Sequence, residues 1–217
     1  HGATNVFEYH KMGYTSEAMF SYLLQLGWSS YNEDNYQFSK AVDLFTLEKI
    51  NKSPSKFDIK KLNNINSKFL NNMDINEVYD LVCKSFNLNL ENIQKNRLVA
   101  FLPELLKRVN VYTEIRDDIE WIVNESFICI DSDNQKILNA NLTLLKEISL
   151  LLNSCSWTKD NINSTLKNYI INKNLKFKEI GYPLRLALTG KINSPDLVSV
   201  IYELGCTIVT NRLNYQY

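Results

Sequence analysis

The chain has 217 residues, of which 45% are hydrophobic, and its 24 basic and 24 acidic side chains give a formal net charge of zero. This length allows one large domain or two small ones with a buried core. The neutral total argues against a protein that coats nucleic acid nonspecifically. The charge is segregated, however, because residues 109–158 carry a net −5 and residues 159–191 carry +5.

The pattern of apolar residues predicts an all-α fold. Only six Gly and four Pro interrupt it, and apolar residues repeat at i, i+3 and i+4, as on one face of a helix. The expected helices, in chain order, cover residues 16–26, a short segment from Ser39, a segment opening at Asp58, and residues 74–86, 91–108, 113–125, 134–152, 158–172, 184–188 and about 194–205.

Capping residues and prolines set several of these expected ends. Asp58 and Asp74 precede apolar-periodic segments as N-caps. Ser194 with Pro195 starts the last expected helix, and Gly205 ends it. Pro103 predicts a break or kink near Leu102, where two helices could meet, because proline lacks an N–H donor. A turn is expected where Gly, Tyr and Pro follow one another at 181–183.

Other residues restrict the chemistry and the location. The four cysteines lie far apart and form no CxxC pair, so we expect buried thiols in a reducing cytosol. No apolar run approaches the roughly 18 residues that span a bilayer, and the N-terminal residues lack a signal-peptide core. Two histidines cannot build a His-based triad or a multi-His metal site. We expect a cytoplasmic monomer with neither DNA nor a membrane as partner.

The most basic stretch of the chain runs from residue 51 to residue 70. It holds five lysines against a single acid, Asp58, which gives a local charge of +4. On charge alone, a solvated helix face is the preferred interpretation. The residue pattern of this stretch favours a functional surface. The pattern S-P-x-K-F-D-x-x-K-L-x-x-x-N at residues 53–66 resembles the segment after the catalytic domain of bacterial-type glutamyl-tRNA synthetases.

Two further blocks resemble the same family in the same order. Residues 2–28, GATNVFEYHKMGYTSEAMFSYLLQLGW, are similar to its G-A-x-S-V and Y-L-x-x-L-G-W segments, with Ser16 where proline is usual. Residues 182–205, YPLRLALTGKINSPDLVSVIYELG, are similar to its P-[LV]-R-x-A-[LV]-[TS]-G block. The resemblance thus spans the C-terminal half of these synthetases, and it assigns no catalytic residue because the family's nucleotide-binding motifs are absent.

The resemblance implies a division of the chain and a set of RNA-binding residues. Residues 1–72 would form a stem-contact segment that touches the tRNA body, and residues 73–217 a helical anticodon-binding domain, with sub-bundles at about 73–126 and 127–217. Arg185 aligns with an arginine that reads an anticodon base, and Arg108 aligns more loosely with a second one. The lysines that would hold tRNA phosphates are Lys61, Lys56 and Lys68.

The resemblance also implies the activity of the parent protein. Such a synthetase attaches glutamate to tRNA(Glu), with tRNA(Gln) as a second candidate, and uses ATP and Mg²⁺. This chain would recognise RNA, need no cofactor and be inactive alone. Two alternatives stay open: a helical protein-interaction scaffold without RNA binding, suggested by the balanced charge, and an enzyme active in its own right.

Overall fold

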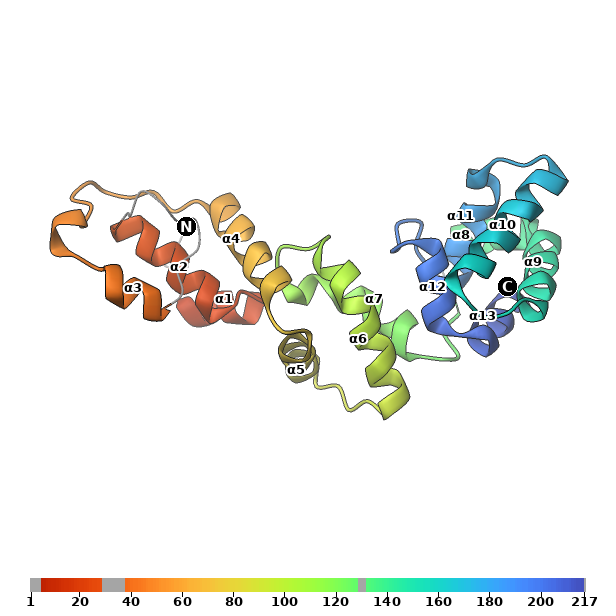
Figure 1. Ribbon diagram of the computed structural model, residues 1–217, viewed down its shortest axis with the longest axis horizontal. Coiled ribbons are helices and arrows are strands. Elements are labelled where there is room, and N and C mark those ends of the chain that lie inside the picture. The colour runs from red at the N-terminus through yellow and green to blue at the C-terminus, as the bar shows by residue number, and fades with distance from the viewer. Residues whose placement is uncertain (1–4, 29–37, 129–131, 217) are drawn as a thin grey trace. The chain divides into compact units, whose positions relative to one another are not determined.

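The computed structural model describes residues 5–28, 38–128 and 132–216 (Figure 1). Within these ranges the regular structure is helical, apart from one antiparallel bridge between Trp28 and Ile50, so the all-α prediction is confirmed. The helices are α1 Val6–Met12, α2 Ser16–Gly27, α3 Phe38–Leu44, α4 Ile59–Asn72, α5 Ile75–Phe86, α6 Asn92–Leu106, α7 Arg116–Val123, α8 Ser132–Ala140, α9 Leu142–Ser154, α10 Lys159–Lys173, α11 Phe177–Thr189, α12 Leu197–Leu204 and α13 Cys206–Leu213, with 3-10 turns η1 Leu47–Lys49 and η2 Tyr112–Ile115.

The chain divides into two compact units. Unit 1 comprises His1–Asn89 and Leu102–Arg116, and unit 2 comprises Leu90–Phe101 and Asp117–Tyr217. One division point falls inside α6, between Phe101 and Leu102. The division into residues 1–72 and 73–217 concerns function and stays a prediction.

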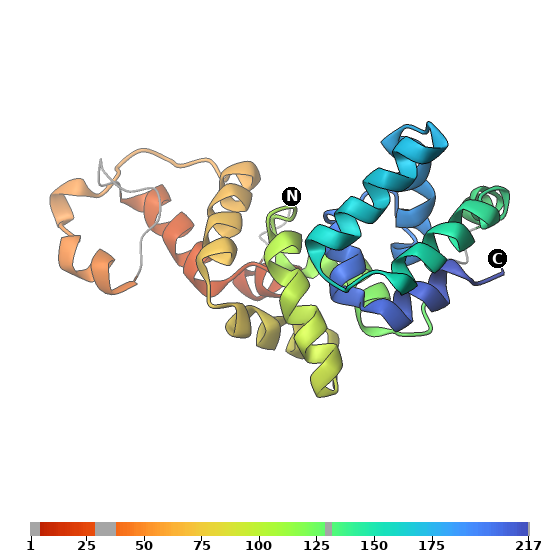
Figure 2. The same ribbon diagram turned by 45° about the vertical axis from the view of Figure 1, so that its right-hand side comes forward.

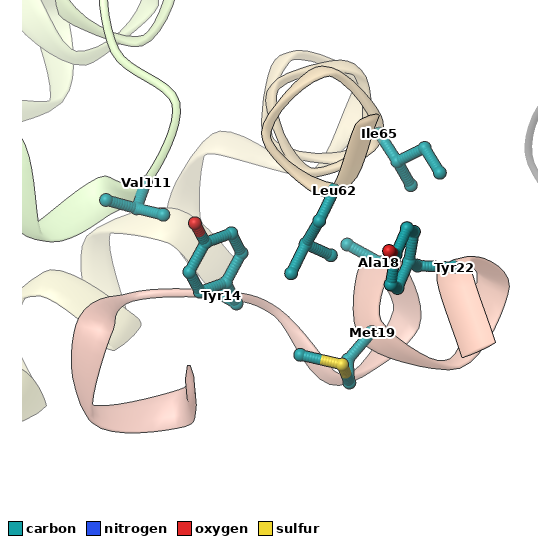
Figure 3. Packing of buried hydrophobic residues seen from close by; sticks show 7 residues of the cluster. All are labelled: Tyr14, Ala18, Met19, Tyr22, Leu62, Ile65 and Val111. Atoms are coloured by element: carbon teal, nitrogen blue, oxygen red, sulfur yellow. The ribbon is translucent and has the colours of Figure 1, made fainter. Parts of the chain in front are cut away.

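The core of unit 1 forms where α2 packs against α4. Leu62 of α4 is fully buried among side chains from α2 and the turn before it, including Tyr14, Ala18 and Tyr22 (Figure 3). Val111, from the segment after α6, closes the same cluster. The apolar stripe of α4 therefore faces α2 and leaves its lysines on the outside.

The core of unit 2 lies among α9, α10, α11, α12 and α13, which gather at the C-terminal end of the chain (Figures 1 and 2). Each of these helices contributes fully buried apolar side chains, including Leu145, Ile148, Ile162, Leu184, Ala187, Val200, Ile201 and Val209. Arg212 of α13 is also buried, and its guanidinium donates to the carbonyl oxygens of Leu188, Trp121 and Asn124.

The helix starts predicted from Asp58 and Asp74 as caps are confirmed. The Asp58 carboxylate accepts from the backbone N–H groups of Lys60 and Lys61, and Asp74 accepts from Asn76 N–H. Thr15 and Thr158 cap α2 and α10. A short polar side chain at the N-cap satisfies a donor that the helix itself leaves unpaired, so these positions are strongly determined.

Three predictions that involve prolines are wrong. The break expected near Leu102 does not occur, because helix α6 continues through Pro103 and the burial of Phe101, Leu102, Leu105 and Leu106 outweighs the lost hydrogen bond; the kink expected as the other possibility stays a prediction. The expected turn at 181–183 lies within α11, where Gly181 and Pro183 are buried. The last helix begins at Leu197 with Asp196 as its N-cap, whose carboxylate accepts from Ser199 N–H, instead of with Ser194.

Other segments also differ from expectation. The helix expected over 113–125 is η2 followed by α7, and the one over 134–152 is divided at Asn141 into α8 and α9. Helices α1 and α13 were not predicted. Three cysteines, Cys83, Cys155 and Cys206, are partly exposed free thiols instead of buried ones, and Cys129 lies outside the described residues.

Candidate nucleic-acid interface

The basic segment before α4 is fastened to α2 by several contacts. Asn51 N–H donates to the Gly27 carbonyl at 2.8 Å, and the Ser55 hydroxyl donates to the Leu26 carbonyl. Phe57 packs edge-on against Tyr22, with ring centroids 5.0 Å apart. Lys56 is exposed between these anchors, so its ammonium is presented from a held backbone.

Lys61 and Lys68 lie on the exposed side of α4, seven residues or about two turns apart. Lys60 and Lys61 occupy the first turn, which contains no acidic residue. The helix dipole disfavours cations there by about 0.3–1 kcal/mol each. Lysines at this position oppose helix stability, which favours a role in binding an anion.

Arg108 lies in a loop that α4 also positions. The buried side chain of Asn66 donates to the Asn110 carbonyl at 2.6 Å and accepts from Thr15 N–H at 2.9 Å. Asn71 donates to the Leu106 carbonyl at 3.4 Å. The backbone is therefore held on both sides of Arg108. Its side chain is exposed and makes no hydrogen bond or ion pair to any residue that the structure describes.

Arg185 is half-buried in α11, and its guanidinium contacts the loop before α12. Nη1 donates to the Ser194 carbonyl at 3.1 Å, to the Ser194 hydroxyl and to the Pro195 carbonyl at 2.6 Å. Ser194, predicted as a helix cap, is thus a partner of Arg185. A guanidinium held in this way has a fixed orientation, and it also joins two elements of unit 2.

The structure groups the predicted site residues in two places. Lys56, Lys61, Lys68 and Arg108 belong to unit 1, and Arg185 belongs to unit 2. Among the residues of the second block, Asp58 caps α4, Leu62 and Asn66 are buried in its packing, and the lysines are exposed. The positioning role of Asn66 was not predicted; the signal was an Asn beside Ile65 in the apolar stripe of α4.

The basic segment 159–191 is less available to bind an anion than its net charge suggests. Three of its lysines form ion pairs within unit 2: Lys159 with Glu203 at 3.2 Å, Lys173 with Glu147 at 2.8 Å, and Lys191 with Asp118 at 2.9 Å. Lys167, Lys176 and Lys178 remain exposed. The +5 of this segment is therefore partly neutralised by acids from neighbouring elements.

A membrane span and a metal site are both absent from the described ranges. No helix there is long and apolar enough to cross a membrane. No group of three or more His, Cys, Asp or Glu side chains in the same ranges could hold a metal ion.

Comparison with known proteins identifies the family. The sequence matches the anticodon binding domain family over residues 57–217. Glutamate–tRNA ligase 1 of Bartonella henselae is 34% identical over 227 residues, which cover all of this chain and 47% of that protein. Glutamate–tRNA ligase 2 of a Wolbachia pipientis strain from Culex pipiens is 32% identical over 216 residues, which cover 98% and 47%. The chain therefore spans about half the length of the curated relatives it matches.

Solved structures show the same fold. A glutamate tRNA ligase from Elizabethkingia meningosepticum, in complex with its amino acid, has a TM-score of 0.81 at 20% sequence identity over 95% of this chain and 41% of that one. The synthetase from Elizabethkingia anophelis gives a TM-score of 0.76 at the same identity. The chain belongs to the anticodon-binding domain family and corresponds to the C-terminal part of a glutamate–tRNA ligase.

Proposed function

We propose that this chain recognises tRNA(Glu), with tRNA(Gln) as a second candidate, for a glutamate–tRNA ligase. The observation that carries the proposal is the family match over residues 57–217, which includes the exposed lysines of α4 together with Arg108 and Arg185. The parent protein, a cytoplasmic monomer, attaches glutamate to tRNA with ATP and Mg²⁺. We place that reaction in the part of the relatives that this chain does not cover, and we expect the chain alone to be inactive.

The two kinds of basic residue have different tasks in this proposal. Lys56, Lys61 and Lys68 hold backbone phosphates, because an ammonium is a compact charge on a flexible stem and reads no sequence. Arg108 and Arg185 hydrogen-bond to anticodon bases, which can be splayed out of a loop and recognised on their edges. The rigid fork of the guanidinium suits this task, and the fixed orientation of Arg185 supports it.

Binding of tRNA transcripts to the chain, measured by fluorescence anisotropy at increasing salt, tests the proposal. We expect affinity to fall steeply with salt. For each phosphate that the chain neutralises, the logarithm of the binding constant should fall by about 0.7–0.9 per unit of log salt concentration. Absence of tRNA binding at low salt would contradict it and would favour a protein-interaction scaffold. ATP–pyrophosphate exchange by the chain alone would show that the missing half is not needed for activation.

The base-reading role of Arg185 needs a test that separates it from the loop contact. Arg185→Ala should reduce discrimination among anticodon variants, about ten- to a hundredfold for one good bidentate arginine–base pair. Ser194→Ala removes a loop partner and keeps the guanidinium. If both variants weaken all tRNAs equally, Arg185 only shapes the loop.

A further inference from the structure

A hollow in unit 1 is lined by basic side chains that no sequence motif connects. It has a volume of about 550 Å³ and lies between the end of α1, the last turn of α5 and the segment from η2 to the start of α7. Its lining includes Lys11, Lys84 and Arg116 together with His10, and the described residues contribute no acid to it. Three separate segments therefore bring cations to one concave surface.

These cations are poorly neutralised by the protein itself. Lys11 pairs with Glu8 at 3.0 Å, and both side chains are well exposed, so this pair is weak. Lys84 and Arg116 form no ion pair with any described residue. The dipole at the end of α5 favours Lys84, but Arg116 is the first residue of α7, where a cation is disfavoured. A bound anion would supply the negative charge that Lys84 and Arg116 lack.

Two groups of the lining are held in place by their neighbours. The Ser85 hydroxyl donates to the hydroxyl of Tyr112, a buried side chain, at 3.1 Å. The Arg116 guanidinium lies 5.3 Å from the centre of the Phe86 ring, and this cation–π contact restricts its orientation. Oriented cations are groups that bind phosphate oxygens.

We propose that this hollow binds a phosphate of the RNA backbone, at a contact separate from the lysines of α4. The inference rests on the proposed function and adds a second place where unit 1 holds the same RNA. A volume of about 550 Å³ is much larger than one phosphate group, so a phosphodiester with its flanking riboses fills it better than a free phosphate. Oriented cations recognise the backbone and not the base sequence.

The test is tRNA binding by the full chain carrying Lys84→Ala and Arg116→Ala together. Affinity should fall about tenfold for every tRNA, and the salt slope should fall by about 1. The control carries Lys136→Ala and Lys146→Ala, which removes the same charge from exposed positions on α8 and α9. Lys84→Ala alone, at an exposed position, covers the case in which the double variant does not fold, and Lys84→Arg should retain binding.

Two measurements identify the source of the phosphate. In ethylation interference, one or two tRNA phosphates should block binding to the unaltered chain when ethylated and have no such effect on the double variant. Calorimetry with inorganic pyrophosphate tests a free anion. Pyrophosphate binding that depends on Lys84 and Arg116, with tRNA affinity unchanged, would overturn the proposal.

Two outcomes distinguish a failure of tRNA recognition from a failure of the phosphate contact in the hollow. If the unaltered chain binds no tRNA, the proposed function itself fails. If the unaltered chain binds tRNA and the double variant binds as tightly as the control, tRNA recognition stands and the phosphate contact in this hollow is wrong.

Discussion

Replacing Asn66 by Ala tests how unit 1 holds the loop that carries Arg108. The variant leaves the buried N–H of Thr15 without its acceptor, which costs about 1–3 kcal/mol. It also removes the donor to the carbonyl of Asn110, an exposed residue, where water can replace the bond and the cost is about 0.5–1.5 kcal/mol. We expect the free energy that is needed to open unit 1 to fall by about 2–4 kcal/mol.

Hydrogen exchange resolved by peptide is the suitable assay, because two units need not unfold together. The loss corresponds to about 30- to 1,000-fold faster exchange in α2 and α4, with the loop from Lys107 to Asn110 exchanging faster as well. Asn64→Ala is the control, since Asn64 is exposed on the same helix. If exchange in the two variants agrees within threefold, the reasoning about Asn66 is wrong.

Three further changes have defined outcomes. Lys61→Ala should weaken all tRNAs alike in anisotropy titrations, and a change confined to one anticodon variant would contradict phosphate binding. Arg212→Met leaves three backbone carbonyls without their donor and should lower the stability of unit 2 by about 2–4 kcal/mol in urea denaturation; a loss under 1 kcal/mol would refute this. Burial, and then the hydrogen bond to Glu147, raises the pKa of Tyr169 from 10.0 to about 12, so its protonated phenol contributes stability in full below pH 10. The advantage of the unaltered chain over Tyr169→Phe should therefore decline from pH 10 to 12 in alkaline unfolding, and a constant difference would argue against the shift.

Helices with side-chain caps could be predicted from the sequence because their signals are local. Asp58, Asp74 and Thr158 each precede an apolar stripe and accept from the N–H groups that the following helix leaves unpaired. Of helix α11, only residues 184–188 could be predicted, since the Gly and Pro at 181 and 183 normally end a helix. Burial of these residues within unit 2 overrides that local preference.

Helix α13 was missed for a different reason. Gly205 ends α12 and also precedes the first residue of α13, with φ of +83°. Sequence rules interpret Gly as a stop and give no sign that a helix resumes at the next residue. Only the packing of α13 against α9 and α11 determines that it does.

For the candidate site as well, features with a local sequence signal could be predicted, and features that depend on tertiary packing could not. The exposure of Lys61 and Lys68 follows from the helix period, because the buried positions of α4 fix the opposite side. The contacts of Arg185 with Ser194 and Pro195 could not be predicted, because they depend on how the loop before α12 folds back onto α11. The basic hollow combines three segments without a motif, so only the fold reveals it.

The packing of α2 on α4 matters for anyone who shortens this protein for expression. The family match begins at Phe57, yet the stripe of α4 is covered by Tyr14, Ala18, Met19 and Tyr22. A protein cut at residue 57 would expose Leu62 and Ile65 to water and invite aggregation. It would also remove Thr15, a partner of Asn66. The limits of sequence similarity are therefore a poor guide to where this polypeptide can be trimmed.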